Sequence, residues 1–129
     1  LGGVLAVHKN LDAIFDMPDA NKVQLHDASE SGPSSDAHGV AGARLSDIGK
    51  GLDDFQAVDV GLFWCADRFA EALEAERADS GDCWTNDAVE RLCDTNHFRF
   101  WDIDDARWCD VDTPEDRVHA EELVESFRD

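Results

Sequence analysis

The sequence predicts an α/β fold, and three of its segments carry that prediction. Ala57 to Cys65 is a near-continuous apolar run of strand length, as expected for a strand that is buried on both faces. Phe98 to Ile103 alternates in the manner of a strand. After Pro114, apolar residues recur at the helical spacing i, i+3, i+4 and i+7: Ala120, Leu123, Val124 and Phe127. Strands mixed with helices in a chain of 129 residues indicate a single α/β domain.

Three further strands are expected in the first half of the chain. Gly3 to His8 and Lys22 to His26 have strand patterns, and Pro18 to Asn21 between them is typical of a turn. Another strand is expected near Ala43 to Ile48. Residues 28–42 before it are rich in Ser, Gly and Asp with little apolar content, which predicts an exposed loop.

Two helices are expected between the strands of the second half. The first runs from about Asp67 to Arg77, and Ser80 to Asp82 ends it. The second begins near Thr85 and places three apolar residues on one face: Val89, Leu92 and Cys93.

The chain carries a net charge of −19 and is poor in lysine, which limits its partners. Such a surface repels nucleic acid and anionic membranes, so neither is expected to bind. Acidic disorder is an alternative, but a hydrophobic content of 43% with clear periodicity argues against it. The composition favours a protein from a halophile's cytoplasm, because molar salt shortens the Debye length to about 3 Å and screens the self-repulsion.

The cysteines and tryptophans are both expected to be mainly buried. The four cysteines have neither CxxC nor zinc-finger spacing, which favours buried free thiols in a reducing cytoplasm over a disulfide framework. The tryptophans are expected to pack against the core, with Trp84 as the one that could instead line a pocket. The sequence contains no signal-peptide pattern and no transmembrane run.

The most informative segment runs from Trp108 to Asp116. Asp110 and Asp112 lie two residues apart, so in an extended strand their carboxylates share one face. Thr113 is a good N-cap and Pro114 suits the first position of a following helix. Two carboxylates delivered just before a helix are a plausible site for Mg²⁺, which prefers oxygen ligands. The alternative is an ordinary strand–helix junction whose carboxylates are solvated.

This segment resembles the closing motif of the sugar-nucleotidyltransferase family. Upstream segments are similar to motifs of the same family, in the same order. They are Ala20-Asn21-Lys22-Val23, Leu45-Ser46-Asp47-Ile48-Gly49-Lys50, Val58-Asp59-Val60-Gly61-Leu62-Phe63 and Thr85-Asn86-Asp87-Ala88-Val89. The subgroup that the sequence resembles most is the cytidylyltransferases acting on inositol 1-phosphate and related phosphate esters.

The resemblance implies a domain organisation as well as a fold. The family's domain is longer and opens with a Gly-rich nucleotide loop, and no such loop is present in these residues. Residues 1–129 are therefore expected to be the C-terminal portion of a Rossmann-like nucleotidyltransferase domain, a mixed sheet flanked by helices. A fragment, a mis-started gene product and a split subunit all remain open.

Three residues are the leading site candidates under this resemblance. Asp110 matches the family's Mg²⁺-ligand position, and Asp112 is the adjacent supporting ligand. Lys50, between two glycines in a chain that avoids lysine, matches the lysine that holds the substrate phosphate and is the catalytic candidate. The alternative for Lys50 is a solvated loop lysine.

Four other residues are candidates for substrate binding. Asp59 and Gly61 are expected to face the alcohol or sugar, although Asp59 could instead cap neighbouring backbone. Lys22 could contact a phosphate, but a side chain pointing outward from its strand is slightly favoured. Asp87 is a weaker candidate, because a carboxylate in the first turn of a helix needs no functional explanation.

The implied activity is nucleotidyl transfer from a nucleoside triphosphate, with CTP favoured, to a sugar phosphate or polyol phosphate. Pyrophosphate is released and Mg²⁺ is the expected cofactor. The alternative is a non-catalytic, truncated or degenerate subunit that binds a partner or ligand. The expected protein partner is either the missing N-terminal half or another copy of the chain.

The acidic composition predicts that salt stabilises the fold. The melting temperature should rise from dilute buffer to molar KCl, because the added ions screen repulsion among the carboxylates. Thermal melts across a KCl series measure this. A melting temperature that stays level or falls with salt contradicts the halophilic interpretation.

Overall fold

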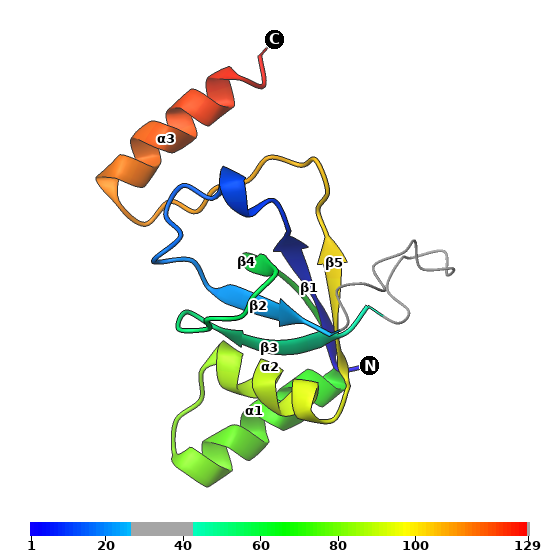
Figure 1. Cartoon of the computed structure of the whole chain (residues 1–129). Helices are drawn as coiled ribbons and strands as arrows, with labels where there is room; N and C mark the ends of the chain where they lie inside the picture. The colour runs from blue at the N-terminus through cyan, green and yellow to red at the C-terminus, as the bar shows by residue number, and fades with distance from the viewer. Residues whose placement is uncertain (27–42, 129) are drawn as a thin grey trace.

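The computed structural model describes residues 1–26 and 43–128, so the predicted loop 28–42 lies outside the described residues. The described chain forms a mixed sheet with the strand order β3-β2-β4-β1-β5, which confirms the predicted α/β class (Figure 1). The strands are β1 (Gly3–His8), β2 (Lys22–Leu25), β3 (Leu45–Gly49), β4 (Ala57–Cys65) and β5 (Phe98–Asp102). The helices are η1 (Leu11–Ala13), α1 (Asp67–Ser80), α2 (Thr85–Asp94) and α3 (Pro114–Glu125).

Strand β1 lies between β4 and β5 in the sheet. It pairs antiparallel with β4 and parallel with β5, while β2 pairs antiparallel with both β3 and β4. The pairing of β1 with β4 shifts register between Leu5 and Val7, opposite Gly61. Gly61 has a φ of 82° and a Cβ there would meet no atom within 4 Å, so its backbone conformation, rather than crowding, explains the glycine.

Helices α1 and α2 pack against one face of the sheet and enclose the core (Figure 1). The ring of Phe98 is fully buried, and its centroid lies 6.2 Å from that of Phe69 and 6.5 Å from that of Phe63. A Cβ on Gly3 would lie only 2.7 Å from the Phe98 ring, so the close packing of β1 against this ring requires a glycine. Helix α2 contributes the apolar face that its sequence predicts, with Val89, Leu92 and Cys93 buried.

The prediction that β4 is buried on both faces is wrong for its second half. Leu62 is 68% exposed and Trp64 is 57% exposed. The reason is that α1 and α2 both pack on the same face of the sheet. In the described chain, no helix covers the other face at β4. The core prediction for tryptophan also fails at Trp84 and Trp101, which are 71% and 48% exposed.

The cysteines are free, as the sequence predicts, but most are not buried. Only Cys93 is buried, and burial raises the pKa of its thiol to about 12. Cys65 is exposed on β4, and Cys83 and Cys109 are intermediate. Cys65 is the last residue of β4 and is exposed there, because a strand pattern alone does not reveal which part of a sheet is covered.

Helix α3 begins where the motif predicts, but the strand expected before it is absent. Thr113 Oγ1 accepts the Asp116 N–H at 3.1 Å, and Asp116 Oδ2 accepts the Thr113 N–H at 2.9 Å, which forms a reciprocal cap. Asp110 and Asp112 lie in a segment without regular secondary structure that pairs with no strand of the described chain, since β5 ends at Asp102. None of the helices in residues 1–26 and 43–128 is long and apolar enough to cross a membrane.

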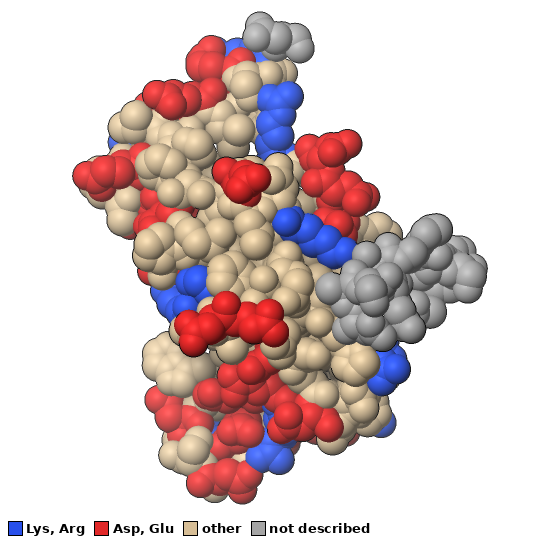
Figure 2. Space-filling view, viewed as in Figure 1, with Lys and Arg blue, Asp and Glu red and all other residues tan. Residues whose placement is uncertain are grey.

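Acidic side chains cover much of the surface, and many lie over α1 and α2 on the face shown in Figure 2. Within residues 1–26 and 43–128, few of them have a basic partner within 4.0 Å. In the described chain, Arg91 bridges Glu76 and Asp79, joining the two helices. The scarcity of such pairs agrees with a surface in which bulk salt, rather than internal ion pairs, limits repulsion.

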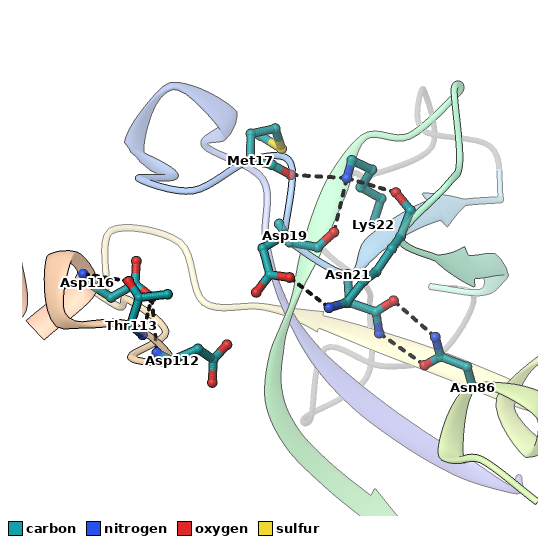
Figure 3. A network of polar contacts seen from close by, with 10 residues as sticks. Met17, Asp19, Asn21, Lys22, Asn86, Asp112, Thr113 and Asp116 are labelled. Atoms are coloured by element: carbon teal, nitrogen blue, oxygen red, sulfur yellow. Dashed lines mark hydrogen bonds and ion pairs between the residues drawn. The ribbon is translucent and has the colours of Figure 1, made fainter.

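Lys22 neither points outward nor presents a free ammonium group. Its side chain is buried, with 8% of the residue exposed. The Nζ atom donates to the carbonyls of Met17 at 3.0 Å, Ala20 at 3.1 Å and Lys50 at 2.9 Å (Figure 3). The expectation of an outward side chain is therefore wrong, because three carbonyl acceptors offset the cost of burying this cation.

Replacing Lys22 with Ala should destabilise the fold by about 2–4 kcal/mol, since it leaves three carbonyls without their donor. The matched control is Lys9→Ala, whose Nζ lies 4.0 Å from Asp102 at a partly exposed surface and should cost less than about 1 kcal/mol. Urea unfolding of both variants provides the comparison. Equal losses at the two positions would show that the Lys22 contacts have no special structural role.

Candidate functional site

One pocket brings together residues that the sequence analysis singled out separately. Its volume is about 130 Å³. Its lining includes five of the predicted site residues: Lys50, Asp59, Gly61, Asp110 and Asp112. Lys50 and Asp110, which were predicted from separate motifs, thus border the same pocket. The remaining lining residues are Asp19, Asn21, Val60 and Trp108.

Lys50 is the only lysine among the described residues that line the pocket. It follows β3, and its Nζ lies 2.9 Å from Asp19 Oδ1. The hydrogen bond and charge of Asp19 raise the pKa of Lys50, so its ammonium form is favoured. Both side chains are largely exposed, so water weakens this ion pair and an incoming phosphate can compete with Asp19 for the ammonium.

Asp59 is held at the wall of the pocket by two donors. Its carboxylate accepts the Gly61 N–H at 2.5 Å and the Asn21 Nδ2 at 3.0 Å. Burial raises the pKa of Asp59, while these two hydrogen bonds oppose the rise by favouring the charged form. The alternative given by the sequence, in which Asp59 caps nearby backbone, therefore occurs at Gly61, and the carboxylate still borders the pocket.

Asn21 links the pocket to helix α2. Its Nδ2 also donates to Asn86 Oδ1 at 3.0 Å, and Asn86 Nδ2 donates back to Asn21 Oδ1 at 3.0 Å (Figure 3). This exchange uses both amide groups and orients Asn21 toward Asp59. Asn21 and Asp19 are not predicted as site residues from the sequence, because Asp and Asn in a turn are explained by turn formation alone.

Asp110 lies close enough to Asp112 to affect the ionisation of the Asp112 carboxyl. The charge of Asp110 is the main cause of the raised pKa of Asp112, and Asp19 adds to it. Asp110 also contributes to the raised pKa of Asp59. Four carboxylates therefore repel one another around a single lysine, and a bound cation would relieve that repulsion.

The donor set fits part of a Mg²⁺ site and leaves the rest to other ligands. In residues 1–26 and 43–128, no group of three or more His, Cys, Asp or Glu side chains is arranged to hold a metal ion. Mg²⁺ is commonly bound by one or two carboxylates, with waters and substrate phosphates completing the octahedron. Asp110 and Asp112 fit that requirement, and their role as metal ligands stays a prediction.

Asp87 lies outside this pocket. Its carboxylate accepts the Trp84 N–H at 3.0 Å and caps α2. It borders a different hollow, whose one basic residue, Arg91, is already paired with Glu76 and Asp79. Lys22 is also absent from the pocket lining, because its ammonium group is used within the fold.

Comparisons with known proteins agree with the motifs. No family model matches the sequence. The chain is 36% identical over 93 residues to a bifunctional IPC transferase and DIPP synthase of Rubrobacter xylanophilus, which covers 64% of this chain and 19% of that protein. The structure of the inositol-1-phosphate CTP transferase from T. maritima matches with a TM-score of 0.68 and 23% identity, over 92% of this chain and 43% of that one.

These comparisons confirm the predicted resemblance to cytidylyltransferase-like nucleotidyltransferases and the α/β fold. The chain spans about a fifth of the curated relative's length and less than half of the structural relative's length. The fold match is the broader of the two comparisons, because it extends over nearly the whole chain.

Replacing Asp110 with Asn should lower the pKa of the Asp112 carboxyl toward its ordinary value. Removing the Asp110 charge makes it easier for Asp112 to lose its proton. NMR titration of the side-chain carboxyl carbons measures the shift. Asp54→Asn, outside the pocket lining, is the control and should leave Asp112 unchanged. An Asp112 titration that is unaffected by Asp110→Asn would show that the two carboxylates do not interact.

Proposed function

We propose, from the resemblance to cytidylyltransferase-like nucleotidyltransferases, that this chain supplies the acceptor-binding and Mg²⁺-binding part of a nucleotidyltransferase site. The reaction transfers CMP from CTP to a polyol phosphate such as inositol 1-phosphate and releases pyrophosphate. The observation that carries the proposal is that Lys50 and the Asp110–Asp112 pair, 60 residues apart in sequence, share one pocket with Asp59.

Transfer of this kind depends on positioning and charge neutralisation more than on a covalent nucleophile. An oxygen of the acceptor's phosphate attacks the α-phosphorus of the triphosphate, and the bond to the leaving pyrophosphate breaks. Lys50 would hold the acceptor's phosphate in line for this attack by exchanging Asp19 for the phosphate oxygens. Asp110 and Asp112 would hold Mg²⁺, which when bound offsets negative charge on the transferred phosphoryl group.

Asp59 and Gly61 suit the non-phosphate part of the acceptor. The Asp59 carboxylate is oriented by Asn21 and can accept a hydrogen bond from a hydroxyl group of a polyol. Gly61 has no side chain, and a Cβ there would meet nothing within 4 Å, so a ligand can approach the backbone. Trp108 adds an aromatic surface to the same lining.

The described pocket is too small and too acidic to hold a nucleoside triphosphate unaided. Its volume of about 130 Å³ is below the roughly 300–1,000 Å³ of typical ligand sites. Its single lysine faces Asp19, Asp59, Asp110 and Asp112, while a triphosphate is itself strongly anionic. We therefore place the triphosphate-binding groups on a segment outside these 129 residues.

A non-catalytic subunit is the second candidate function. It is favoured by the Lys50–Asp19 ion pair, which neutralises the lysine without a ligand. In this case the chain would bind a phosphate ester, but a domain completed with a triphosphate-binding segment would not catalyse nucleotidyl transfer. Calorimetric titration of inositol 1-phosphate with Mg²⁺, alongside an activity assay, separates the two candidates.

The activity test uses pyrophosphate release with each nucleoside triphosphate in turn. This chain alone should show no turnover. Joining it to the part of the T. maritima enzyme that this chain does not match should restore release, with CTP preferred. Robust turnover by the 129 residues alone would contradict the proposal, because the triphosphate would then be held within them.

In the joined protein, Asp110→Asn should reduce turnover about 10²-fold or more, the scale of losing one charge contact in the transition state. Lys50→Ala should act mainly by raising the KM for the acceptor, since it removes a phosphate contact. Asp87→Asn, outside the pocket, is the matched control and should keep near-normal rates. An undiminished rate for Asp110→Asn would rule out the proposed metal position.

A further inference from the structure

Asn86 lies outside the pocket lining, yet it contacts the residue that holds the Asp59 carboxylate. It is the second residue of α2, and its side chain points toward Asn21, just before β2 (Figure 3). Asn21 and Asn86 are 65 residues apart in the sequence, so no local pattern reveals their contact. A residue on a helix of the core therefore reaches the candidate site through one intermediate side chain.

Asn21 is fixed to Asp59 at two points. The Asp59 N–H donates to the Asn21 carbonyl at 2.9 Å, and Asn21 Nδ2 donates to Asp59 Oδ2 at 3.0 Å. The first contact joins the two backbones, and the second orients the carboxylate. The second contact requires the Asn21 amide to present its nitrogen, because its oxygen would repel the carboxylate of Asp59.

Asn86 determines which way the Asn21 amide faces. Asn21 Nδ2 also donates to Asn86 Oδ1 at 3.0 Å, and Asn86 Nδ2 donates to Asn21 Oδ1 at 3.0 Å. Rotating the Asn21 amide by half a turn would break both of these bonds as well as the bond to Asp59. The two amides therefore hold each other, and the Asp59 carboxylate, in one arrangement.

Helix α2 gives Asn86 a fixed position. Val89 and Leu92 of this helix are buried in the core, and Asp87 caps its first turn by accepting the Trp84 N–H at 3.0 Å. A side chain on an element that is anchored in this way holds its partners more precisely than a side chain on a loop. The orientation of the carboxylate in the pocket is thus set from the helical layer of the fold.

The arrangement leaves Asp59 able to accept hydrogen bonds but not to donate them. Its Oδ1 accepts the Gly61 N–H at 2.5 Å and its Oδ2 accepts from Asn21, and both bonds favour the ionised carboxyl. Each carboxylate oxygen can still accept from a further donor. A hydroxyl group of a ligand supplies such a donor, whereas a deoxy carbon supplies none and a phosphate group meets a like charge.

We propose that Asn86 is a positioning residue for acceptor selection. Through Asn21, it holds Asp59 where the carboxylate accepts a hydroxyl group of a polyol monophosphate whose phosphate lies at Lys50 in the same pocket. The site thereby disfavours analogues in which that hydroxyl group is missing or is itself phosphorylated. The identity of the ligand rests on the proposed function, whereas the positioning of Asp59 by Asn86 does not.

The positioning of Asp59 is tested in this chain without any ligand. NMR follows the side-chain amide protons of Asn21 and the carboxyl carbon of Asp59. Asn86→Ala removes both contacts with the Asn21 amide, so it should shift all of these signals. Asn10→Ala, at an exposed asparagine outside the pocket lining, is the matched control and should leave them unchanged. Signals that stay unchanged in Asn86→Ala would overturn the inference.

Acceptor selection is tested by calorimetric titration of this chain with Mg²⁺ and inositol 1-phosphate, its deoxy analogues or inositol bisphosphates. Inositol 1-phosphate should bind about tenfold more tightly, or better, than one deoxy analogue and the corresponding bisphosphate, the scale of a hydrogen bond to a charged group. Asn86→Ala should reduce the preference over that deoxy analogue to within about threefold, by weakening the binding of inositol 1-phosphate. Lys50→Ala should weaken the binding of both compounds and keep this preference, because it removes a contact with the phosphate that they share.

A second substitution separates hydrogen bonding from packing. Asn86→Asp keeps the size of the side chain, but it removes the donor to Asn21 Oδ1 and places a carboxylate oxygen against it. It should therefore lose the preference as Asn86→Ala does, while the melting temperature stays close to that of the unchanged chain, since Asn86 is only partly buried. Full preference in Asn86→Asp would show that the shape of the side chain matters rather than its amide, and would overturn the inference.

The outcomes distinguish this inference from the proposed function. Binding of inositol 1-phosphate with no preference over any deoxy analogue supports the function and overturns acceptor selection by Asp59. No binding of any phosphate ester, together with Asn21 signals that respond to Asn86→Ala, overturns the function and the selection but supports the positioning of Asp59. A preference that Asn86→Ala leaves intact overturns the role of Asn86.

Discussion

The buried ammonium group of Lys22 is the contact on which the pocket depends. By donating to the carbonyls of Met17, Ala20 and Lys50, it ties the turn before β2 to the residue after β3. Asp19 lies within that turn, so the same contact sets the positions of both partners in the Asp19–Lys50 ion pair. Lys22, which its sequence motif suggests as a phosphate ligand, therefore has a structural role. Its contact with the Lys50 carbonyl helps to position Lys50, whose side chain is exposed in the pocket.

The acidic composition of the chain has a local counterpart in the site. Asp19, Asp59, Asp110 and Asp112 line one pocket with a single lysine, and the charge of Asp110, with a smaller contribution from Asp19, raises the pKa of Asp112. Such an arrangement favours cations over anions until a metal ion or basic groups change the balance. The structure that this chain resembles is more than twice as long as the part matched, which fits the proposal that further residues complete the pocket.

The sequence predicts most elements because their signals are local. The apolar run of β4, the amphipathic face of α2 and the Thr113 cap each depend on residues close together in the chain. The strand expected at Asp110 and Asp112 does not form, because a strand needs a neighbour and nearby residues do not reveal whether one exists. Asn21 was missed for a related reason, since its partners Asp59 and Asn86 are 38 and 65 residues away.

The residues of the pocket are held by two different parts of the fold: Asp112 by the cap of α3, and Lys50 and Asp59 by the sheet. Asp116 Oδ2 accepts the backbone N–H of Asp112 at 3.0 Å, so the backbone of Asp112 is anchored to the start of the helix rather than to the sheet. Lys50 and Asp59, by contrast, belong to strands or to residues directly joined to them. Any displacement of α3 relative to the sheet would therefore carry Asp112 toward or away from Lys50 while leaving Asp59 in place. The distance between Asp112 and Lys50 is in this way set by the position of helix α3, independently of the strands.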